Sequence, residues 1–263
     1  MTTLVAEGLS LGYGPRTVVS NLDLTVPPGA VTAIVGANGC GKSTLLRAFG
    51  RLLAPAGGRV LLDGRDLRRT PTREVARTLA VLPQSPVAPA GISVYDLVAR
   101  GRHPYQTWLR QWSARDAEVV AETLAQTGLT DLAARPVDQL SGGQRQRAWI
   151  AMALAQRTDL LLLDEPTTYL DLTHQIEVLD LVHALNREQG RTVVMVLHEL
   201  NLAARYADHM VVLRDGAVAA QGAPADVLTA DLLRDAFRLT AAVVPDPLSG
   251  EPLIIPATRK GSQ

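Results

Sequence analysis

The 263-residue sequence has a single cysteine, few aromatic residues and no excess of charge of either sign. The lone thiol, Cys40, excludes an internal disulfide and fits a reducing compartment. Basic and acidic residues number 26 each, so the electrostatic basis for binding nucleic acid is missing and we expect no nucleic-acid partner. Only two of the 26 basic residues are lysines, Lys42 and Lys260. A lysine inside a motif is therefore informative.

Long apolar runs are also missing. Apolar runs such as residues 160–163 are far shorter than the roughly 20 residues that span a bilayer. The first seven residues lack the basic and apolar regions of a signal peptide. We therefore expect a cytoplasmic chain that neither crosses a membrane nor is secreted. Its length and its 47% hydrophobic residues suffice for one large α/β domain or two small ones.

Short apolar strands alternate with helical patterns along the chain, which is typical of a parallel sheet with helices on its faces. The predicted buried strands are Val31–Val35, Leu79–Leu82, Leu160–Leu163 and Thr192–Leu197. A helix is predicted over Lys42–Leu53, directly after the first strand. The segment before that strand, together with Gly58–Asp63, indicates a smaller antiparallel lobe.

Helical patterns replace the strands between Pro86 and Thr158, which predicts a helical subdomain inserted in the core. One helix should span Ser113–Gln126, because Ser113 and Asp116 have the spacing of an N-terminal cap pair. Further along, we expect a helix near Leu200–Ala207, followed by a hairpin.

The predicted hairpin has its first strand at Met210–Arg214 and its turn at Asp215-Gly216. The tail, 243–256, holds four prolines and a glycine and is expected to be extended. We therefore expect one domain over 1–263. Its catalytic core and β lobe take 1–85 and 159–240, its helical subdomain takes 86–158, and its extended tail takes 241–263.

The segment GANGCGKS, residues 36–43, fits G-x-x-x-x-G-K-[ST] and lies between a strand and a helix. Glycines let the backbone N–H groups point inward, and the helix N-terminus adds partial positive charge. Lys42 would reach the β- and γ-phosphates, and the Ser43 hydroxyl would ligate Mg²⁺. This segment predicts polyphosphate binding. Cys40 within it is better explained as a small side chain in a tight turn than as a redox-sensitive thiol.

Two acids follow the run of four leucines at 160–163. A buried parallel strand would deliver them to the carboxyl edge of the sheet, where ligands bind. Asp164 would hold Mg²⁺, and Glu165 would orient or deprotonate the attacking water. A second glycine-rich helix start, LSGGQ at 140–144, precedes a helical pattern through Ala155, with Ser141 and Gln144 spaced as a capping box.

These three segments, in this order, resemble the ATP-binding cassette (ABC) family over nearly the whole chain. The resemblance implies a P-loop NTPase (RecA-like) fold with ATP and Mg²⁺ as cofactors. It also implies a head-to-tail homodimer in which LSGGQ of one copy, here called the signature segment, closes on the γ-phosphate held by the other copy. Residues implied to bind nucleotide are Tyr13, Gly36, Asn38, Gly39, Cys40, Gly41, Lys42, Ser43, Thr44, Gln84, Ser141, Gly142, Gly143, Gln144 and Asp171.

The resemblance also assigns roles to single positions. Tyr13 would stack on adenine, its alternative being a core tyrosine at a strand edge. Gln84 would touch Mg²⁺ beside Ser43 and Asp164 and sense the membrane partner. His198 would contact the γ-phosphate and position Glu165, so that Lys42, Glu165 and His198 form the catalytic set. Residues 169–171, here called the interface loop, would cross the dimer interface.

Four further segments resemble the ATPases of bacterial ferric-siderophore importers. They are 99–105, 167–171, His174-Gln175 and 246–253. Glu199 departs from the aspartate expected there, which should have a mild effect because both are acids. The resemblance implies a peripheral subunit on the cytoplasmic face of the membrane. Its partners would be permease subunits and, indirectly, a periplasmic or lipid-anchored substrate-binding protein.

Three alternatives stay open. Haem and cobalamin importers are similar in the same segments. A soluble cassette protein acting on nucleic acid or ribosomes usually has two cassettes, coiled coils or basic extensions. A small-molecule kinase would have no use for LSGGQ. We also expect Gln84 and the segment through Arg102, His103 and Tyr105 to receive a permease helix, although His103 and Tyr105 could instead pack locally.

Overall fold

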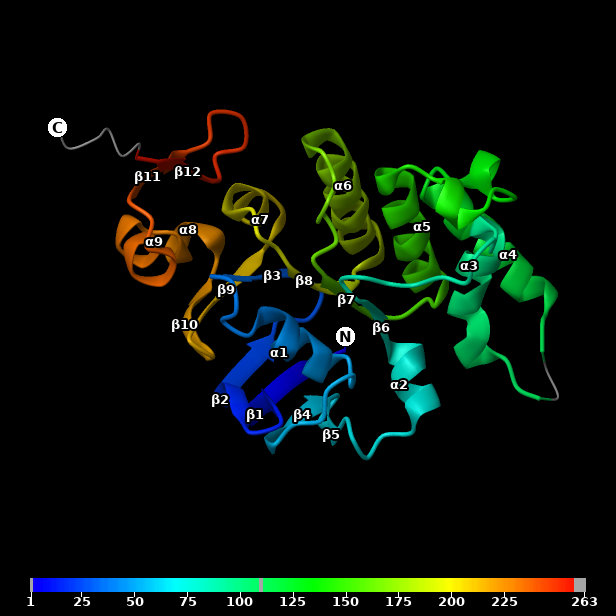
Figure 1. Cartoon of the computed structure of the whole chain (residues 1–263), viewed down its shortest axis with the longest axis horizontal. Coiled ribbons are helices and arrows are strands. Elements are labelled where there is room, and N and C mark those ends of the chain that lie inside the picture. Colours follow the sequence, from blue (N-terminus) through cyan, green and yellow to red (C-terminus); the bar gives the residue numbers. More distant parts are fainter. Residues whose placement is uncertain (1, 109–110, 258–263) are drawn as a thin grey trace.

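The computed structural model describes residues 2–108 and 111–257. At its centre is a six-stranded sheet, shown in Figure 1, in the order β10 (Ala217–Gly222), β9 (His209–Arg214), β3 (Val31–Gly36), β8 (Thr192–Val196), β7 (Leu160–Asp164) and β6 (Leu79–Leu82). All neighbours are parallel except β10, which pairs antiparallel with β9. The predicted strands, the parallel core and the hairpin at Asp215-Gly216 are confirmed.

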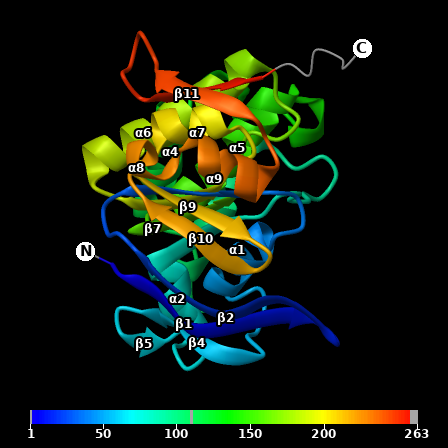
Figure 2. The ribbon, with the colours of Figure 1, turned by 90° about the vertical axis from the view of Figure 1, so that its left-hand side faces the viewer.

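The central strands are largely apolar because both faces of the sheet are covered. Side chains alternate along a strand, so in β7 Leu161 and Leu163 pack into one core and Leu160 and Leu162 into the other. Helices α6 (Leu172–Gln189) and α7 (Leu200–Tyr206) lie over one face. Helix α1 (Lys42–Phe49) and a smaller sheet lie over the other, and Figure 2 shows these layers edge on.

Helix α1 ends at Phe49, so the predicted helix to Leu53 was too long. Arg51 adopts a left-handed backbone with φ 59°. The N–H of Leu52 bonds to the carbonyl of Arg47, and that of Arg51 to the carbonyl of Ala48. This pair of bonds is the Schellman motif, which closes a helix C-terminus. The sequence did not indicate this helix end, because an arginine occupies the position that usually carries glycine.

The smaller sheet is antiparallel, as predicted. Its order is β2 (Arg16–Val26), β1 (Leu4–Tyr13), β4 (Gly57–Leu62) and β5 (Arg65–Asp66). Helix α2 (Thr72–Thr78) leads from it to β6.

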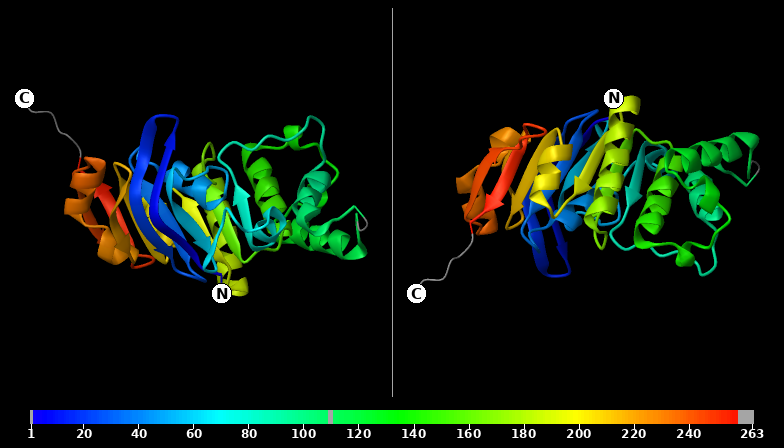
Figure 3. Two further views of the ribbon diagram at one scale, coloured as in Figure 1. Left: turned by 90° about the horizontal axis from the view of Figure 1, so that it is seen from below. Right: turned by 90° about the horizontal axis from the view of Figure 1, so that it is seen from above.

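The chain between β6 and β7 forms a helical region at one end of the molecule, coloured green in both views of Figure 3. Its elements are α3 (Val94–Ala99), η1 (Arg100–Tyr105), α4 (Ala114–Gln126), η2 (Thr130–Leu132), η3 (Val137–Gln139) and α5 (Gly142–Ala155). Ser113 and Asp116 form the predicted capping box at the start of α4.

After β10 come helices α8 (Pro224–Val227) and α9 (Ala230–Phe237) and a hairpin of β11 (Ala241–Pro245) and β12 (Pro252–Pro256). The expected extended tail is thus a two-stranded sheet. It is held to α7 by the side chain of Asn201, whose Nδ2 donates to the carbonyl oxygen of Ile254 and whose Oδ1 accepts from the N–H of Ile254. Residues 258–263 of the predicted tail lie outside the described residues. Within the described chain, every helix is too short or too polar to span a membrane.

Candidate functional site

The loop between β3 and α1 has the backbone of a phosphate cradle. Gly36 and Gly41 have φ values of 152° and 109°, in the region that favours glycine. A Cβ on Gly36 would lie 2.3 Å from the carbonyl oxygen of Leu213. Gly41 caps α1 without a side-chain bond. The first N–H groups of the helix are thus available to an anion.

Lys42 crosses this loop. Its Nζ donates to the carbonyl oxygens of Gly36 at 2.8 Å and Ala37 at 3.1 Å, and the residue is 5% exposed. Both partners are neutral, and no ion pair to Lys42 occurs among the described residues. The ammonium charge is therefore held in place and remains uncompensated, as a phosphate ligand requires.

Asp164 ends β7 with a buried carboxylate. The residue is 2% exposed, and neither oxygen has a hydrogen-bond partner within the described part of the chain. Burial raises its pKa, an effect that the nearby Ser43 hydroxyl opposes. An unpartnered carboxylate in the interior is unfavourable unless a cation offsets it. A carboxylate beside a hydroxyl is a donor set that suits Mg²⁺.

Glu165 sits at the centre of a hydrogen-bonded cluster. His198 Nε2 lies 2.7 Å from its Oε1, and Gln84 Nε2 and Thr168 Oγ1 donate to its Oε2 at 2.5 and 3.0 Å. Burial alone would raise the pKa of Glu165, but the hydrogen bond and charge of His198, together with the hydrogen bonds from Thr168 and Gln84, outweigh it and lower the pKa. Glu165 also has φ 54°, a strained backbone of the kind found at functional sites.

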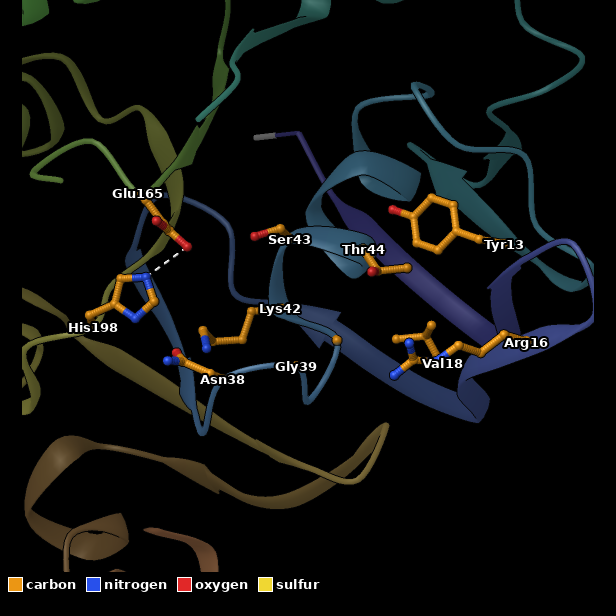
Figure 4. Close-up of a pocket in the computed structure, with 11 residues that line it drawn as sticks. Tyr13, Arg16, Val18, Asn38, Gly39, Lys42, Ser43, Thr44, Glu165 and His198 are labelled. Carbon is orange, nitrogen blue, oxygen red and sulfur yellow. Dashed lines mark ion pairs between the residues drawn. The ribbon is translucent and has the colours of Figure 1, made fainter. Parts of the chain in front are cut away.

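Lys42, Glu165 and His198 line one cavity of about 320 Å³, shown in Figure 4. Glu165 and His198 lie at one end, Lys42 and Ser43 lie between, and Tyr13 lies at the other end. Tyr13 is 46% exposed, and its hydroxyl accepts from Arg47 Nη1 at 3.2 Å. The exposed ring favours a stacking surface over a core tyrosine. The lining residues are Tyr13, Arg16, Val18, Asn38, Gly39, Gly41, Lys42, Ser43, Thr44, Glu165 and His198.

Sequence reasoning missed Arg16, Val18 and Thr168. Arg16 pairs with Tyr13 across the β1–β2 turn, so the alternation of the second strand could have placed Arg16 and Val18 on one face. Thr168 carried no signal, because its contact with Glu165 depends on the turn after β7.

The signature segment does not line this cavity. Ser141 and Gln144 form the predicted capping box, with Gln144 N–H donating to Ser141 Oγ at 3.3 Å. Asp171 caps α6 by accepting from His174 N–H at 3.0 Å. Beside Asp171, Tyr169 is 94% exposed. One copy of the chain therefore brings the phosphate-loop residues and Glu165 together but leaves Ser141–Gln144 and Asp171 outside that cavity.

Cys40 is 7% exposed, and burial raises the pKa of its thiol. Its carbonyl accepts from Gly216 N–H at 3.2 Å. A buried, protonated thiol is unreactive. These features favour a small packing side chain over a redox-sensitive one.

The expectation that Arg102 lies on a permease-binding surface was wrong. Arg102 is 5% exposed, with its Nε 2.9 Å from Asp116 Oδ1 and its guanidinium 3.9 Å from the Tyr105 ring centroid. The Tyr105 hydroxyl donates to the carbonyl of Gln156 at 2.8 Å. The Arg102 guanidinium is buried against Asp116 of α4 because a buried guanidinium needs a carboxylate, and the half-buried Tyr105 packs locally at the end of α5.

Glu199 precedes α7 and makes no side-chain cap, since its carboxylate lies one methylene further out than that of an aspartate. His198 keeps its contact with Glu165 all the same.

A family model described as "ABC transporter" matches residues 19–168. The chain is 56% identical over 259 residues to YusV of Bacillus subtilis (strain 168), named a probable siderophore transport system ATP-binding protein, covering 98% of this chain and 94% of that one. It is 51% identical to the ferric enterobactin transport ATP-binding protein FepC of Escherichia coli (strain K12), covering 97% and 94%. It is 41% identical to the cobalamin import ATP-binding protein BtuD of Halobacterium salinarum, covering 97% and 63%.

Two solved structures are similar over most of the chain. One is described as a metal-chelate type ABC transporter in an inward-facing conformation, with a TM-score of 0.84, 30% identity and 98% of each chain covered. The other is a dimeric ATP-binding cassette in a post-hydrolysis state with ADP and Pi, with a TM-score of 0.73, 27% identity and coverage of 84% and 98%.

Proposed function

This chain belongs to the ABC transporter family, in which it is an ATP-binding subunit with ATPase activity coupled to transport, and we propose that it powers the import of ferric siderophores. The observation that carries the ATPase assignment is the cavity that joins the phosphate loop to Glu165 and His198. The identity over nearly full length to siderophore and ferric enterobactin transport proteins supports the substrate class.

Binding follows from the loop and its neighbours. Lys42 and the α1 N-terminus would hold the phosphates, and the exposed Tyr13 ring would stack on adenine at the far end of the cavity. Ser43 and Asp164 would hold Mg²⁺, with Gln84 close by through its bond to Glu165. When bound, Mg²⁺ neutralises charge on the phosphate oxygens.

Hydrolysis requires a base that is ionised at neutral pH. The lowered pKa of Glu165 meets this need, and its bonds to His198 and Gln84 fix the direction of its carboxylate. Glu165 would orient and deprotonate the attacking water, and His198 would position Glu165 and contact the γ-phosphate.

The signature segment and the interface loop would act on the nucleotide of a second copy. Ser141 Oγ accepts from Gln144 N–H, which leaves the hydroxyl proton of Ser141 free to donate. Tyr169 and Leu172, exposed by 94% and 65%, flank Asp171 and offer apolar surface to a partner. These features support a head-to-tail homodimer closed by ATP.

A cleft beside Gln84 would receive a short permease helix in place of the Arg102 surface. Its volume is about 210 Å³, and its lining comprises Pro86, Val87, Ala88, Pro89, Ala90, Val137, Asp138, Arg145 and Trp149. Val87 is 90% exposed. A helix seated there would touch the segment that starts at Gln84. Permease binding and nucleotide binding could then both shift the conformation of this segment.

In this proposal the chain lies at the cytoplasmic face of the membrane, with a permease as direct partner and a substrate-binding protein as indirect one. A cobalamin importer is the second candidate, but the siderophore relatives are more similar to the chain and cover more of their own length.

The test is reconstitution of the chain with its permease in proteoliposomes, with the substrate-binding protein added. Ferric-siderophore-loaded binding protein should stimulate ATP hydrolysis, and Val87→Asp should abolish that stimulation while the isolated chain still binds ATP. Stimulation by cobalamin and not by any ferric siderophore would overturn the substrate assignment.

A further inference from the structure

We propose that His174 is a positioning residue that holds the signature segment in register with the interface loop. The proposal rests on the proposed function, in which both segments act on the nucleotide bound by a second copy. His174 lies in the first turn of α6, directly after the interface loop, and nothing in the ATP cavity of its own chain requires a histidine there.

His174 is bonded to the interface loop in two ways. Its backbone N–H donates to Asp171 Oδ1 at 3.0 Å, and its ring Nδ1 lies 2.7 Å from the same oxygen. The backbone bond and then the ring bond lower the pKa of the Asp171 carboxyl. The backbone bond is an ordinary helix cap that many residues could supply. The ring bond requires this side chain.

The other edge of the ring lies against the signature segment. A Cβ on Gly143 would lie 2.3 Å from His174 Cδ2 and 2.8 Å from Cγ, closer than real Cβ atoms come. A Cβ on Gly142 would meet only Leu170 Cδ2, at an ordinary 3.7 Å. Gly143 is therefore glycine because the imidazole occupies the space where its side chain would be.

The same two helices meet again one turn further along. Arg147 Nη1 lies 3.9 Å from Glu177 Oε2, four residues after Gly143 and three after His174. Helices α5 and α6 thus run side by side in the same direction, with their capped N-termini at one end (Figure 1). The partly buried His174 ring is the contact nearest that end.

One ring therefore links the two segments that a second copy of the chain would meet. Its Nδ1 fixes the side chain of Asp171, and its Cδ2 edge sets how closely α5 approaches α6. A small displacement at this contact would move Ser141 relative to Asp171. His174 would thereby affect hydrolysis in the dimer without touching ATP in its own copy.

The test is a double-mutant cycle on the full chain with His174→Ala, Gly143→Ala and both together, measuring kcat and KM for ATP. His174→Ala should lower kcat about ten- to a hundredfold with little change in KM, and His174→Asn, which keeps a donor for Asp171, should recover part of the loss. Gly143→Ala should be worse. The double variant should be more active than Gly143→Ala alone, because removing the ring makes room for the new Cβ.

Two results would overturn the proposal: wild-type kcat in His174→Ala, or losses that simply multiply in the double variant. Binding of ATP by monomers, measured by fluorescence titration, should be unchanged in all four variants. A wild-type chain that neither hydrolyses ATP nor dimerises with it would instead count against the proposed function.

Discussion

Gln84 Nε2 lies 2.5 Å from Glu165 Oε2, on the side of the carboxylate opposite to His198, whose Nε2 lies 2.7 Å from Oε1. Glu165 follows β7, and the two residues that hold it follow β6 and β8, the strands on either side of β7 in the sheet. The order of the parallel strands therefore fixes the direction of the carboxylate.

Glu165→Gln should keep Mg-ATP binding and slow hydrolysis by about 10²–10⁴-fold, because it removes the base but not the phosphate contacts. Lys42→Ala should have the opposite effect and abolish productive ATP binding, since it removes the positive charge that holds the phosphates of bound ATP before hydrolysis. Nucleotide titration and ATPase assays on both variants separate the two roles. Hydrolysis at the wild-type rate by Glu165→Gln would show that another group is the base.

The rate of hydrolysis should depend on pH through Glu165. Its pKa is lowered from that of an ordinary glutamate, so it stays ionised at neutral pH, and its contribution is lost only as the pH falls through the lowered pKa. Thr168→Val removes one donor to Oε2, so the acid limb of the single-turnover rate should move to higher pH. An acid limb that stayed in place or moved to lower pH would contradict the role of Thr168.

Arg102→Ala should lower the free energy of unfolding by about 3–5 kcal/mol, because it leaves Asp116 buried without its partner. Arg115→Ala removes an exposed ion pair to Glu118 on the same helix and should leave the free energy of unfolding nearly unchanged. The pKa of Asp116 is lowered, so this stabilisation is complete above about pH 4 and is lost as the pH falls further. Urea unfolding at neutral and acid pH measures both effects, and equal losses in the two variants would count against the buried pair.

The Glu165→Gln chain should sediment as a dimer with Mg-ATP and as a monomer without it. Adding Ser141→Arg should prevent the dimer, because the new side chain blocks the helix start that must approach the partner's γ-phosphate. Thr229→Arg removes a cap of the same kind from the exposed start of α9 and should leave the dimer intact. A dimer that forms without ATP in the Ser141→Arg variant would argue against head-to-tail assembly.

The sequence predicted the elements whose residues carry local signals. The leucine run of β7 reflects burial on both faces of the sheet, the glycines allow the phosphate loop, and Ser113 and Asp116 have the spacing of the cap of α4. It failed where the signal comes from tertiary packing. Nothing near Arg102 in sequence shows that its guanidinium is paired with Asp116 across the fold.

The other features that the sequence did not predict also have physical explanations. Arg51 takes the left-handed position that ends α1, although glycine is the usual mark of such a stop. The contact of Thr168 with Glu165 depends on the strained turn that Glu165 itself begins. The contact between His174 and Gly143 joins two helices whose approach no spacing rule predicts.

The most direct measurement is the uptake of radiolabelled ferric siderophores by cells whose own copy of this chain has been deleted and then restored. The wild-type chain should restore uptake of at least one ferric siderophore, and Glu165→Gln, present at the same level, should not. Cobalamin uptake should be the same with and without the chain. Uptake at the wild-type rate with Glu165→Gln, or restoration of cobalamin uptake alone, would contradict the account.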